Sequence, residues 1–594
     1  MNKVRCATAC VAFLHLALLC AMLPDYFADN DLGYHISLSR QYGIHGQNWW
    51  DNLNWAPSGR PNLQGPALHY AIGFTGRLLG GQGDDYVHAF SIWAVLQWAA
   101  AAFTAFWFAR RYGGDWAALI AVALLTGSAY SAAPFFVGVP SGWIFILAPW
   151  AIHFFLSERP WLSIPFATML VYVHLGGAPV AGFGILLAAL ATRRWKWLLI
   201  CGASILALSS PYMIHFLRHL SWYNGRRGHV AGDYAWLIYL LAVPAYFWLA
   251  RRPKENLFLL IWPWAAFVWI FQDGLRFMLQ TTVAASAIAG IGLARICQRW
   301  ENRAAFVWGV TLLVILATVM PLSIPAVVIE WSWATGRGFP RELDWNEART
   351  LARVVDGAKL NSRIVNSYYD SLSAAMAVYT DLRQEYGHWG EVKPVQNPAA
   401  AIQASDKVYV VPVPPGDPVA LDLQQRGYLQ IHGGAKETSI VTITAGHPLA
   451  EAVETVIPVM RDNMNWLADH AVNNRFPSME VILSPKALAD RTVLMMLQRK
   501  CAGRIELAVL IYSQAVHPAH PNVARGARGS ARGWGSVANF LGDETALDYL
   551  GDARFERFRH NAKALANALP AIGQSQVPTP EIDQLSSRLF KEFF

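Results

Sequence analysis

Three carboxylates follow the first apolar segment of the chain at close spacing. Asp25, Asp29 and Asp31 come within one or two turns of the end of that segment, where a membrane helix would meet water. Acids held at a bilayer interface can act as a base on a substrate whose tail lies in lipid and whose head lies in water. The alternative is that Asp25 and Asp29 only cap an amphipathic helix that starts near Leu32, because acids are common at the first positions of helices.

A polar and aromatic loop follows these acids, and a loop that only joined two membrane helices would not need its content. Its marked residues are three tryptophans, one acid and one arginine: Trp49, Trp50, Trp55, Asp51 and Arg60. The tryptophans can stack on a sugar ring or can belong to the aromatic belt at a membrane surface, and the sequence leaves both open. His35 lies one turn after Asp31, where it is either a ligand-binding group or a packed, hydrogen-bonded histidine.

The composition indicates an integral membrane protein with a substantial soluble part. Of the 594 residues, 54% are hydrophobic, only 15% are charged and 26 are tryptophan, which excludes a disordered chain. The net charge of +8 does not indicate a nucleic-acid partner, because most basic residues of the first half lie in short joints between apolar segments. The six cysteines form neither a disulfide framework nor CxxC pairs, so they do not identify the compartment.

Apolar segments fill residues 1–329, and a segment needs about 20 residues to cross a bilayer. We predict about 11 transmembrane helices, near 6–24, 87–109, 115–134, 141–157, 161–176, 178–192, 196–214, 234–250, 255–272, 275–295 and 303–329. The first of these has the basic start of a signal peptide, but no small-residue cleavage site precedes the acids. We therefore predict an uncleaved first helix.

Basic residues fall in alternate joints, and the positive-inside rule assigns those joints to the cytoplasm. The joints carry Lys3 and Arg5, Arg110 and Arg111, Arg159, Arg193 with Arg194 and Lys196, Arg251 with Arg252 and Lys254, and Arg295 with Arg299 and Arg303. The N-terminus is then cytoplasmic, and loops 25–86 and 215–233 and the whole region after 330 lie outside the inner (cytoplasmic) membrane. Arg226 and Arg227 lie in loop 215–233 against this rule, which favours a functional role for them.

Residues 330–446 predict a soluble α/β domain on the outer side of the membrane. The stretch NEARTLARVVDGA has helical spacing, whereas SRIVNSYY, DKVYVVPV and TSIVTIT have the pattern of strands. Residues 447–594 predict a mainly helical C-terminal extension. The chain is thus predicted to have a transmembrane domain over 1–329, with external loop 25–86, and two soluble sections after it.

The residues after Asp31 follow an order that resembles a known family. A helical segment is followed by a W-x-D-x-x-x-W-x-P-x-G-R pattern between Trp49 and Arg60. This order is similar to the first external loop of the oligosaccharyltransferase catalytic subunits, which belong to the GT-C superfamily of membrane glycosyltransferases. The resemblance implies a site with Asp31 as the catalytic base, Asp29 as the alternative base, and His35, Asp51 and Arg60 as substrate-binding residues.

A second resemblance covers Gly274–Ile296, where LRFMLQTTVAASAIAGIGLARI is similar to a late transmembrane segment of the same family. The family's arginine in that segment lies near the lipid-linked donor, and here that residue is Arg276. A guanidinium at a bilayer edge suits a phosphate, because its fork donates to two oxygens in parallel. The alternative is an arginine that snorkels and anchors a helix end. Arg226 and Arg227 are second candidates for binding the phosphate.

The second external loop departs from the family. There the family has an acidic pair that helps the first-loop acid to hold a divalent metal, and here Val139, Pro140 and Ser141 occupy those positions. A hard cation needs several oxygen ligands. The sequence therefore argues against a complete Mg or Mn site, and Asp31 is the candidate ligand that remains.

The soluble part also departs from the family. Its members carry a Trp-Trp-Asp-Tyr-Gly motif that reads an acceptor peptide, and here Tyr368, Tyr369 and Asp370 stand at the place of Trp-Trp-Asp. The following Tyr-Gly is absent. These three residues remain candidates for binding an acceptor, but transfer to an asparagine of a peptide is poorly supported.

The combined prediction is a polytopic α-helical membrane protein with a GT-C-like fold and a C-terminal α/β domain outside the membrane. The resemblance implies transfer of a sugar or oligosaccharide from a polyprenyl-phosphate or pyrophosphate donor in the bilayer to a glycan, lipid or protein acceptor. Two alternatives stay open. A lipid-carrier flippase or transporter would carry ionisable residues in mid-membrane and repeated halves, and the sequence has few of the former and no repeat. An inactive scaffold would keep the fold without the chemistry.

Overall fold

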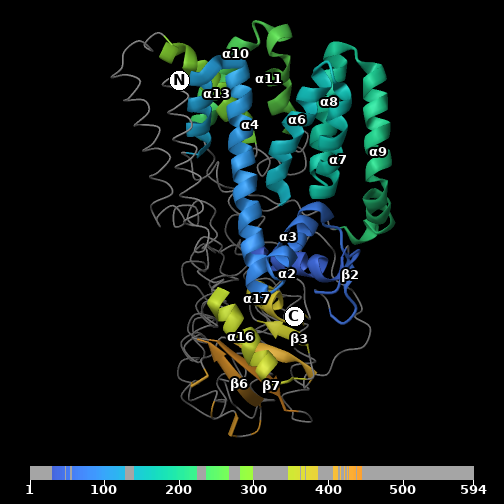
Figure 1. Ribbon diagram of the computed structural model, residues 1–594, viewed down its shortest axis with the longest axis vertical. Helices are drawn as coiled ribbons and strands as arrows, with labels where there is room; N and C mark the ends of the chain where they lie inside the picture. The colour runs from blue at the N-terminus through green and yellow to red at the C-terminus, as the bar shows by residue number, and fades with distance from the viewer. Residues whose placement is uncertain are drawn as a thin grey trace, which may run out of the picture. The chain divides into compact units, whose positions relative to one another are not determined.

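The fold is seen in a computed structural model of the chain (Figure 1). It describes residues 30–46, 48–53, 56–126, 140–223, 236–266, 281–298, 345–360, 363–367, 370–384, 406–411, 415–416, 421, 424–425, 427, 429–435 and 438–444. The predicted spans 6–24 and 303–329 and the predicted extension 447–594 lie outside the described residues.

The chain divides into two compact units. Among the described residues, the first unit holds the helices from α2 (Asn30–His45) to α13 (Thr282–Gln298). The second unit holds the elements from α16 (Trp345–Gly357) to β7 (Thr438–Ile443) together with the short segment Asp51–Arg60. A piece of the predicted external loop 25–86 therefore belongs to the second unit, although it is far from the rest of that unit in sequence.

The described part of the first unit is mainly helical (Figure 1). Its other helices are α3 (Pro66–Leu79), α4 (Gly83–Thr126), α6 (Ile144–Leu156), α7 (Ser163–Val173), α8 (Gly177–Thr192), α9 (Trp195–Arg218), α10 (Trp236–Leu249) and α11 (Pro253–Ala266), with short 3-10 turns at Pro140–Trp143, Pro160–Leu162 and Leu220–Trp222. Within the described residues, each predicted span between 87 and 295 overlaps a helix. Two of the described helices, α4 and α9, are long and apolar enough to cross a membrane, and the full span count stays a prediction.

Helix α4 contains the joint that separates two predicted spans. Gly114 has φ 82° and ψ −171°, a non-helical conformation that favours glycine. Arg110 Nε and Asp115 Oδ1 lie 2.8 Å apart across this break. After it, α4 packs closely on α13, where a Cβ added to Gly290 would come within 2.6 Å of the Ala117 carbonyl oxygen. The glycine therefore lets the chain turn and return along a neighbouring helix.

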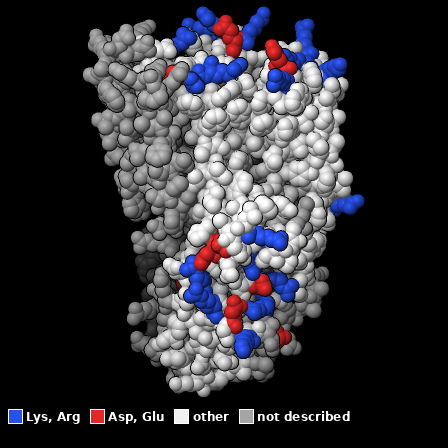
Figure 2. Space-filling view, viewed as in Figure 1, with Lys and Arg blue, Asp and Glu red and all other residues white. Residues whose placement is uncertain are grey.

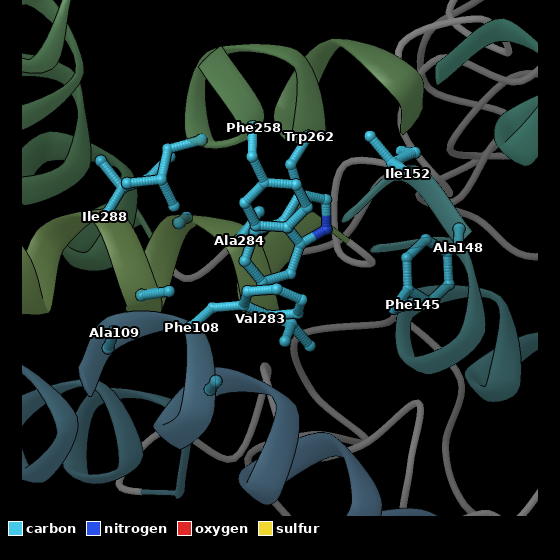
Figure 3. Close-up of a cluster of buried hydrophobic side chains, with 14 of the residues drawn as sticks. Phe108, Ala109, Phe145, Ala148, Ile152, Phe258, Trp262, Val283, Ala284 and Ile288 are labelled. Atoms are coloured by element: carbon cyan, nitrogen blue, oxygen red, sulfur yellow. The ribbon is translucent and has the colours of Figure 1, made fainter. Parts of the chain in front are cut away.

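Aromatic and aliphatic side chains from α4, α6, α11 and α13 form the core of the first unit (Figure 3). The Phe108 and Phe258 rings stack with centroids 4.3 Å apart. Trp262 lies beside both, 5.2 Å from Phe108 and 5.4 Å from Phe258. The small residues Ala284 and Ala148 in the same cluster let these helices approach one another, as small residues do in membrane bundles.

The described basic joints lie together at one end of the first unit. Arg194, between α8 and α9, donates from Nη1 to the Phe155 carbonyl at 2.9 Å and to the Ser157 carbonyl at 2.6 Å, so it caps the end of α6. Arg295 at the end of α13 lies 3.7 Å from the centre of the Trp248 ring near the end of α10. Lysines and arginines gather at this end, and the band of the unit beyond it is uncharged (Figure 2). The arrangement agrees with the predicted alternation of the joints.

The second unit contains a five-stranded mixed sheet. Its strands are β3 (Ile364–Ser367), β4 (Arg383–Gln384), β5 (Val408–Val411), β6 (Leu429–Ala435) and β7 (Thr438–Ile443), in the order β4-β3-β5-β7-β6. β3 is parallel to β4 and β5, whereas β7 is antiparallel to β5 and β6. Leu351 and Val355 of α16 and Met376 of α17 (Asp370–Tyr379) pack on Val410 and Ile440 of the sheet. The predicted α/β pattern is confirmed for the described part of this section.

The segment Asp51–Arg60 lies on the edge strand β4. The Ala56 amide donates to the Gln384 carbonyl at 2.9 Å, and the Gln384 amide donates to the Leu53 carbonyl at 2.6 Å. β1 (Trp50–Asp51) and β2 (Arg60–Pro61) pair with each other at the base of the segment. The segment thus satisfies backbone groups of an edge strand that would otherwise be exposed.

Candidate functional site

Helix α2 places the predicted base at its first turn. α2 begins at Asn30, so Asp31 lies in that turn and His35 follows it on the same face, four residues later. The sequence predicted an amphipathic helix here. Instead, every residue from Leu32 to Ser39 is buried, including the polar side chains of His35 and Ser37. A helix that is enclosed on all sides must find internal partners for its polar groups.

Helix α3 supplies those partners because it lies unusually close to α2. A Cβ added to Gly43 of α2 would come within 2.6 Å of the Gly73 carbonyl oxygen of α3, and a Cβ added to Gly73 would collide with the Ser39 carbonyl. Glycine at both positions removes the side chains that would hold the two backbones apart. The contact brings the ring of His69 in α3 against the ring of His35 in α2.

The two histidines form a buried hydrogen-bonded pair. Nδ1 of His35 and Nε2 of His69 lie 2.8 Å apart, and the ring centroids are 5.1 Å apart with the planes 25° from parallel. Nδ1 of His69 lies 3.1 Å from the Gly65 carbonyl oxygen. The exposed fractions are 2% for His35 and 1% for His69. Burial, together with the charge that His35 can carry, lowers the pKa of His69 to about 3.

This pKa predicts a pH-dependent stability. The unfolded chain binds a proton at His69 below about pH 6.5, whereas the folded chain binds it only below about pH 3. The contribution of His69 to the free energy of unfolding is therefore fully present above the unfolded pKa. It is lost as the pH decreases below that value, by roughly 2 to 3 kcal/mol between pH 6.5 and pH 4.5. Thermal unfolding of the full chain in detergent should show this loss, and His69→Gln should remove that part of it. Parallel pH curves for the two proteins would contradict the prediction, and exposed His88→Gln is the control.

A second set of polar contacts ties the loop after α2 to the end of α9. The Tyr212 hydroxyl donates to the Leu63 carbonyl at 2.7 Å, and Nε2 of His215 donates to the Asn62 carbonyl at 3.0 Å. The Trp49 ring lies 4.7 Å from the His215 ring. These contacts are near the C-terminal end of α9, whereas Arg194 precedes its N-terminal end, about 30 Å away along the helix axis. The α2–α3 layer and the basic joints therefore lie at opposite ends of the first unit.

Tyr42 and Asn62 fix the same loop from the side of α2. Nδ2 of Asn62 donates to the Tyr42 hydroxyl at 3.1 Å and to the Asn48 carbonyl at 3.2 Å. Trp50, by contrast, is 38% exposed and meets His219 and Trp222 edge to face. Of the described tryptophans of the loop, Trp49 is packed and Trp50 forms an exposed aromatic surface. The exposed ring of Trp50 fits either prediction, stacking on a sugar or a place in the aromatic belt at a membrane surface. Trp55 lies outside the described residues.

Asp51 and Arg60 pair with each other inside the second unit. Oδ2 of Asp51 lies 3.5 Å from Nε of Arg60, and each side chain is 1% exposed. Oδ1 of Asp51 accepts a hydrogen bond from the Leu53 amide at 3.0 Å. We predicted both as substrate-binding residues. Their burial and mutual pairing also hold the loop in shape, and the substrate-binding role stays a prediction.

The second external loop offers no ligand set for the Mg or Mn ion that the family implies. Pro140 and Ser141 begin a 3-10 turn and are buried, and neither carries a carboxylate. Val139 lies outside the described residues. Within the described ranges no group of three or more His, Cys, Asp or Glu could hold a metal ion. The described residues therefore offer no ligand set for a divalent cation.

The remaining predicted site residues are only partly visible. Asp370 is the first residue of α17, and the others lie outside the described residues: Asp25, Asp29, Arg226, Arg227, Arg276, Tyr368 and Tyr369. Sequence reasoning missed His69, His215, Tyr42 and Asn62, which the fold brings to the α2–α3 layer. A histidine four residues after Gly65 in the Pro-rich segment was a visible signal for His69, but the segment did not reveal its partner.

No protein-family model matches the chain, and no curated protein sequence matches it. Among solved structures, the apo form of ArnT from Cupriavidus metallidurans matches with a TM-score of 0.50 and 14% identity, over 73% of this chain and 97% of that one. The chain has a GT-C fold. The same ArnT bound to undecaprenyl phosphate gives a TM-score of 0.49 and 14% identity, over 75% and 98% of the two chains.

The apo oligosaccharyltransferase of Archaeoglobus fulgidus gives a TM-score of 0.47 and 13% identity. That match covers 65% of this chain and 65% of the archaeal protein, which is less than two thirds of either. The ArnT match at a TM-score of 0.50 confirms the GT-C fold that the sequence resemblance implies, and GT-C proteins are integral membrane proteins. Identities of 14% or less show the fold alone and transfer no site residue to this chain.

Proposed function

We propose that the GT-C fold serves here as a membrane glycosyltransferase. It would move a sugar or oligosaccharide from a polyprenyl-phosphate or pyrophosphate carrier to a glycan, lipid or protein acceptor on the outer face of the cytoplasmic membrane. The observation that carries the proposal is an acid, Asp31, in the first turn of α2, directly before the buried residues Leu32–Ser39 of this fold. A fold alone does not determine a reaction, so the proposal depends on that residue.

The orientation follows from the charge pattern of the first unit. Its basic joints gather at one end (Figure 2), and the positive-inside rule makes that end cytoplasmic. The α2–α3 layer is tied to the opposite end of α9. A substrate held at this layer would therefore meet the chain on the outer side, where a carrier lipid can present its head group.

The transfer needs a base, a positive group and alignment of the two substrates. Asp31, or Asp29 in its place, would accept the proton of the acceptor hydroxyl or amine. The acceptor atom would form its bond to the anomeric carbon of the sugar while the bond to the phosphate oxygen breaks, and the phosphate would stay on the lipid. Arg276 would offset the charge on the departing phosphate, with Arg226 and Arg227 as second candidates.

Deletion of the gene tests the proposed class of reaction. In the native host we expect the deletion to accumulate a lipid-linked sugar and to deplete one glycoconjugate, because the donor would form without being consumed. Mass spectrometry of organic extracts measures the former, and glycan analysis of the cell envelope measures the latter. Complementation by the wild-type chain is the control. If no lipid-linked sugar and no glycoconjugate changed, the transferase proposal would be wrong.

A further inference from the structure

Helix α3 exposes an apolar face. Tyr70, Phe74 and Leu78 are spaced by four residues, so they lie on one side of the helix, and each is more than half exposed. The other side carries His69 and Gly73, which pack on α2. Three large apolar side chains in a row on one exposed face indicate a surface that meets an apolar partner and not water alone.

Two helices of the same unit mark the outer boundary of the bilayer. The stretch 86–109 of α4 and the stretch 197–217 of α9 contain no Asp, Glu, Lys or Arg. At 1.5 Å per residue these stretches are about 36 Å and about 32 Å long, close to the roughly 30 Å thickness of a hydrocarbon core. The basic joints bound both stretches at the end that the positive-inside rule makes cytoplasmic. The outer boundary therefore lies near Asp85 in α4 and near Arg218 in α9.

Both ends of α3 lie at this outer boundary. At its C-terminal end, α3 stops at Leu79 and α4 begins four residues later at Gly83, the outer end of that helix. Before its N-terminal end, the Leu63 carbonyl accepts from the Tyr212 hydroxyl, and Tyr212 precedes Arg218 by about 9 Å along α9. Helix α3 therefore lies within about 10 Å of the boundary, which is the depth of helices that lie in a membrane interface.

The exposed face of α3 continues an exposed face of α4. Ile92, Leu96 and Phe103 lie on one side of α4 and are exposed. Nε1 of Trp93, beside that face, donates to Oγ1 of Thr75 in α3 at 3.0 Å, and α3 lies alongside this end of α4 (Figure 1). The hydrogen bond joins the borders of the two apolar faces, so they form one surface. Since α4 is long and apolar enough to cross a membrane, lipid is the partner that fits the whole surface.

Arg77 supplies a positive charge at the level where lipid head groups begin. It is exposed in the last turn of α3, beside the apolar face. An arginine can lay its aliphatic stem along acyl chains while its guanidinium reaches the lipid phosphates. Apolar area and a cation on one side of a helix are the two features by which interfacial helices bind a membrane. The depth, the apolar face and the charge therefore agree on the bilayer interface as the partner.

We propose that α3 is an interfacial helix, with Tyr70, Phe74 and Leu78 embedded among the acyl chains of the outer leaflet. This inference does not depend on the proposed transfer reaction, since it uses only the membrane fold and the contacts of α3. It changes the predicted topology, because part of the loop 25–86 then lies in the surface of the bilayer and not in water. The α2–α3 layer is thereby held at the level of the lipid head groups.

A fluorinated side chain at position 74 tests what covers this face. Trifluoromethylphenylalanine in place of Phe74 gives the full chain a single fluorine NMR signal in vesicles of phosphatidylethanolamine and phosphatidylglycerol. Three paramagnetic probes are added in turn: a lipid with a nitroxide near its head group, a lipid with a nitroxide at its chain end, and a water-soluble gadolinium chelate. We expect the first to cause the largest loss of signal. The same label at exposed Phe103 should respond most to the chain-end nitroxide, and at exposed Arg353 of α16 only to the gadolinium chelate.

Other responses at position 74 would overturn the proposal. Loss of signal to the gadolinium chelate alone would place the face in water, and protection from all three probes would mean that a second copy or another segment of the chain covers it. A larger effect of the chain-end nitroxide would make α3 a deeply inserted segment. The same label at Tyr70 repeats the measurement one turn away, so the result does not depend on one variant. Deletion of the gene tests the transferase separately, because lipid-linked sugar can accumulate wherever α3 lies.

Discussion

Replacing Asp31 by Asn should lower sugar transfer by about 10²- to 10⁴-fold, because a positioned general base contributes a factor of that size. Asparagine keeps the volume of aspartate and cannot accept the proton of the acceptor. The position in the first turn of α2 is also one that asparagine occupies readily. We therefore expect the variant to fold. Turnover of lipid-linked sugar by the purified full chain, or restoration of the deletion strain, measures the effect.

Asp84→Asn is the matched control, because Asp84 also lies in the first turn of a helix, α4, in the same predicted external loop. It should retain wild-type turnover. Asp29→Asn decides between the two candidate bases, since the larger loss identifies the base. If Asp31→Asn and Asp29→Asn both kept full turnover while deletion still blocked the pathway, the reaction would not use a first-loop acid as its base. If deletion itself had no effect, an inactive scaffold would be the better description.

Periodicity and charge predicted the described helices of the first unit from α6 onward, but they did not predict α3 within the loop 25–86. The break between α7 and α8 lies within a few residues of the predicted joint between 176 and 178, because a turn between two apolar runs needs polar or small residues. The break in α4 follows the predicted joint between Arg111 and Asp115, because glycine there permits a backbone conformation that other residues avoid. These features are local, so residues that are close in sequence determine them.

The contacts of the candidate site were not predictable in the same way. His35 and His69 are 34 positions apart, and they meet because glycines at 43 and 73 let two helices approach closely. The residues next to each histidine in sequence do not predict which side chain its ring contacts. Likewise, Asp51 and Arg60 matched a family pattern that implies substrate binding, yet they pair with each other once the segment between them lies on β4. Tertiary packing decides both outcomes, and a single sequence records the residues but not their partners.

Arg60→Met should destabilise the segment Asp51–Arg60 by about 3 to 5 kcal/mol, because removing one member of a buried ion pair leaves the other charge enclosed. Both side chains are 1% exposed, and the pair lies at the base of the segment that hydrogen-bonds to β4. Local opening should then release the Ala56 and Gln384 amides. Since each 1.4 kcal/mol is a factor of ten, hydrogen exchange at these two amides should become about 10²- to 10³-fold faster.

A second substitution tests whether the buried charge of Asp51 causes this loss of stability. Asp51→Asn removes that charge and keeps an oxygen that accepts from the Leu53 amide. The double variant should therefore recover part of the protection that Arg60→Met alone loses, which a merely steric effect of methionine would not allow. Arg363→Met is the matched control in the same unit. Its partner Asp356 lies 2.7 Å away, but the side chains are 40% and 50% exposed, so its loss should cost at most about 1 kcal/mol. Equal exchange rates in Arg60→Met and Arg363→Met would mean that burial of the Asp51–Arg60 pair does not hold the segment.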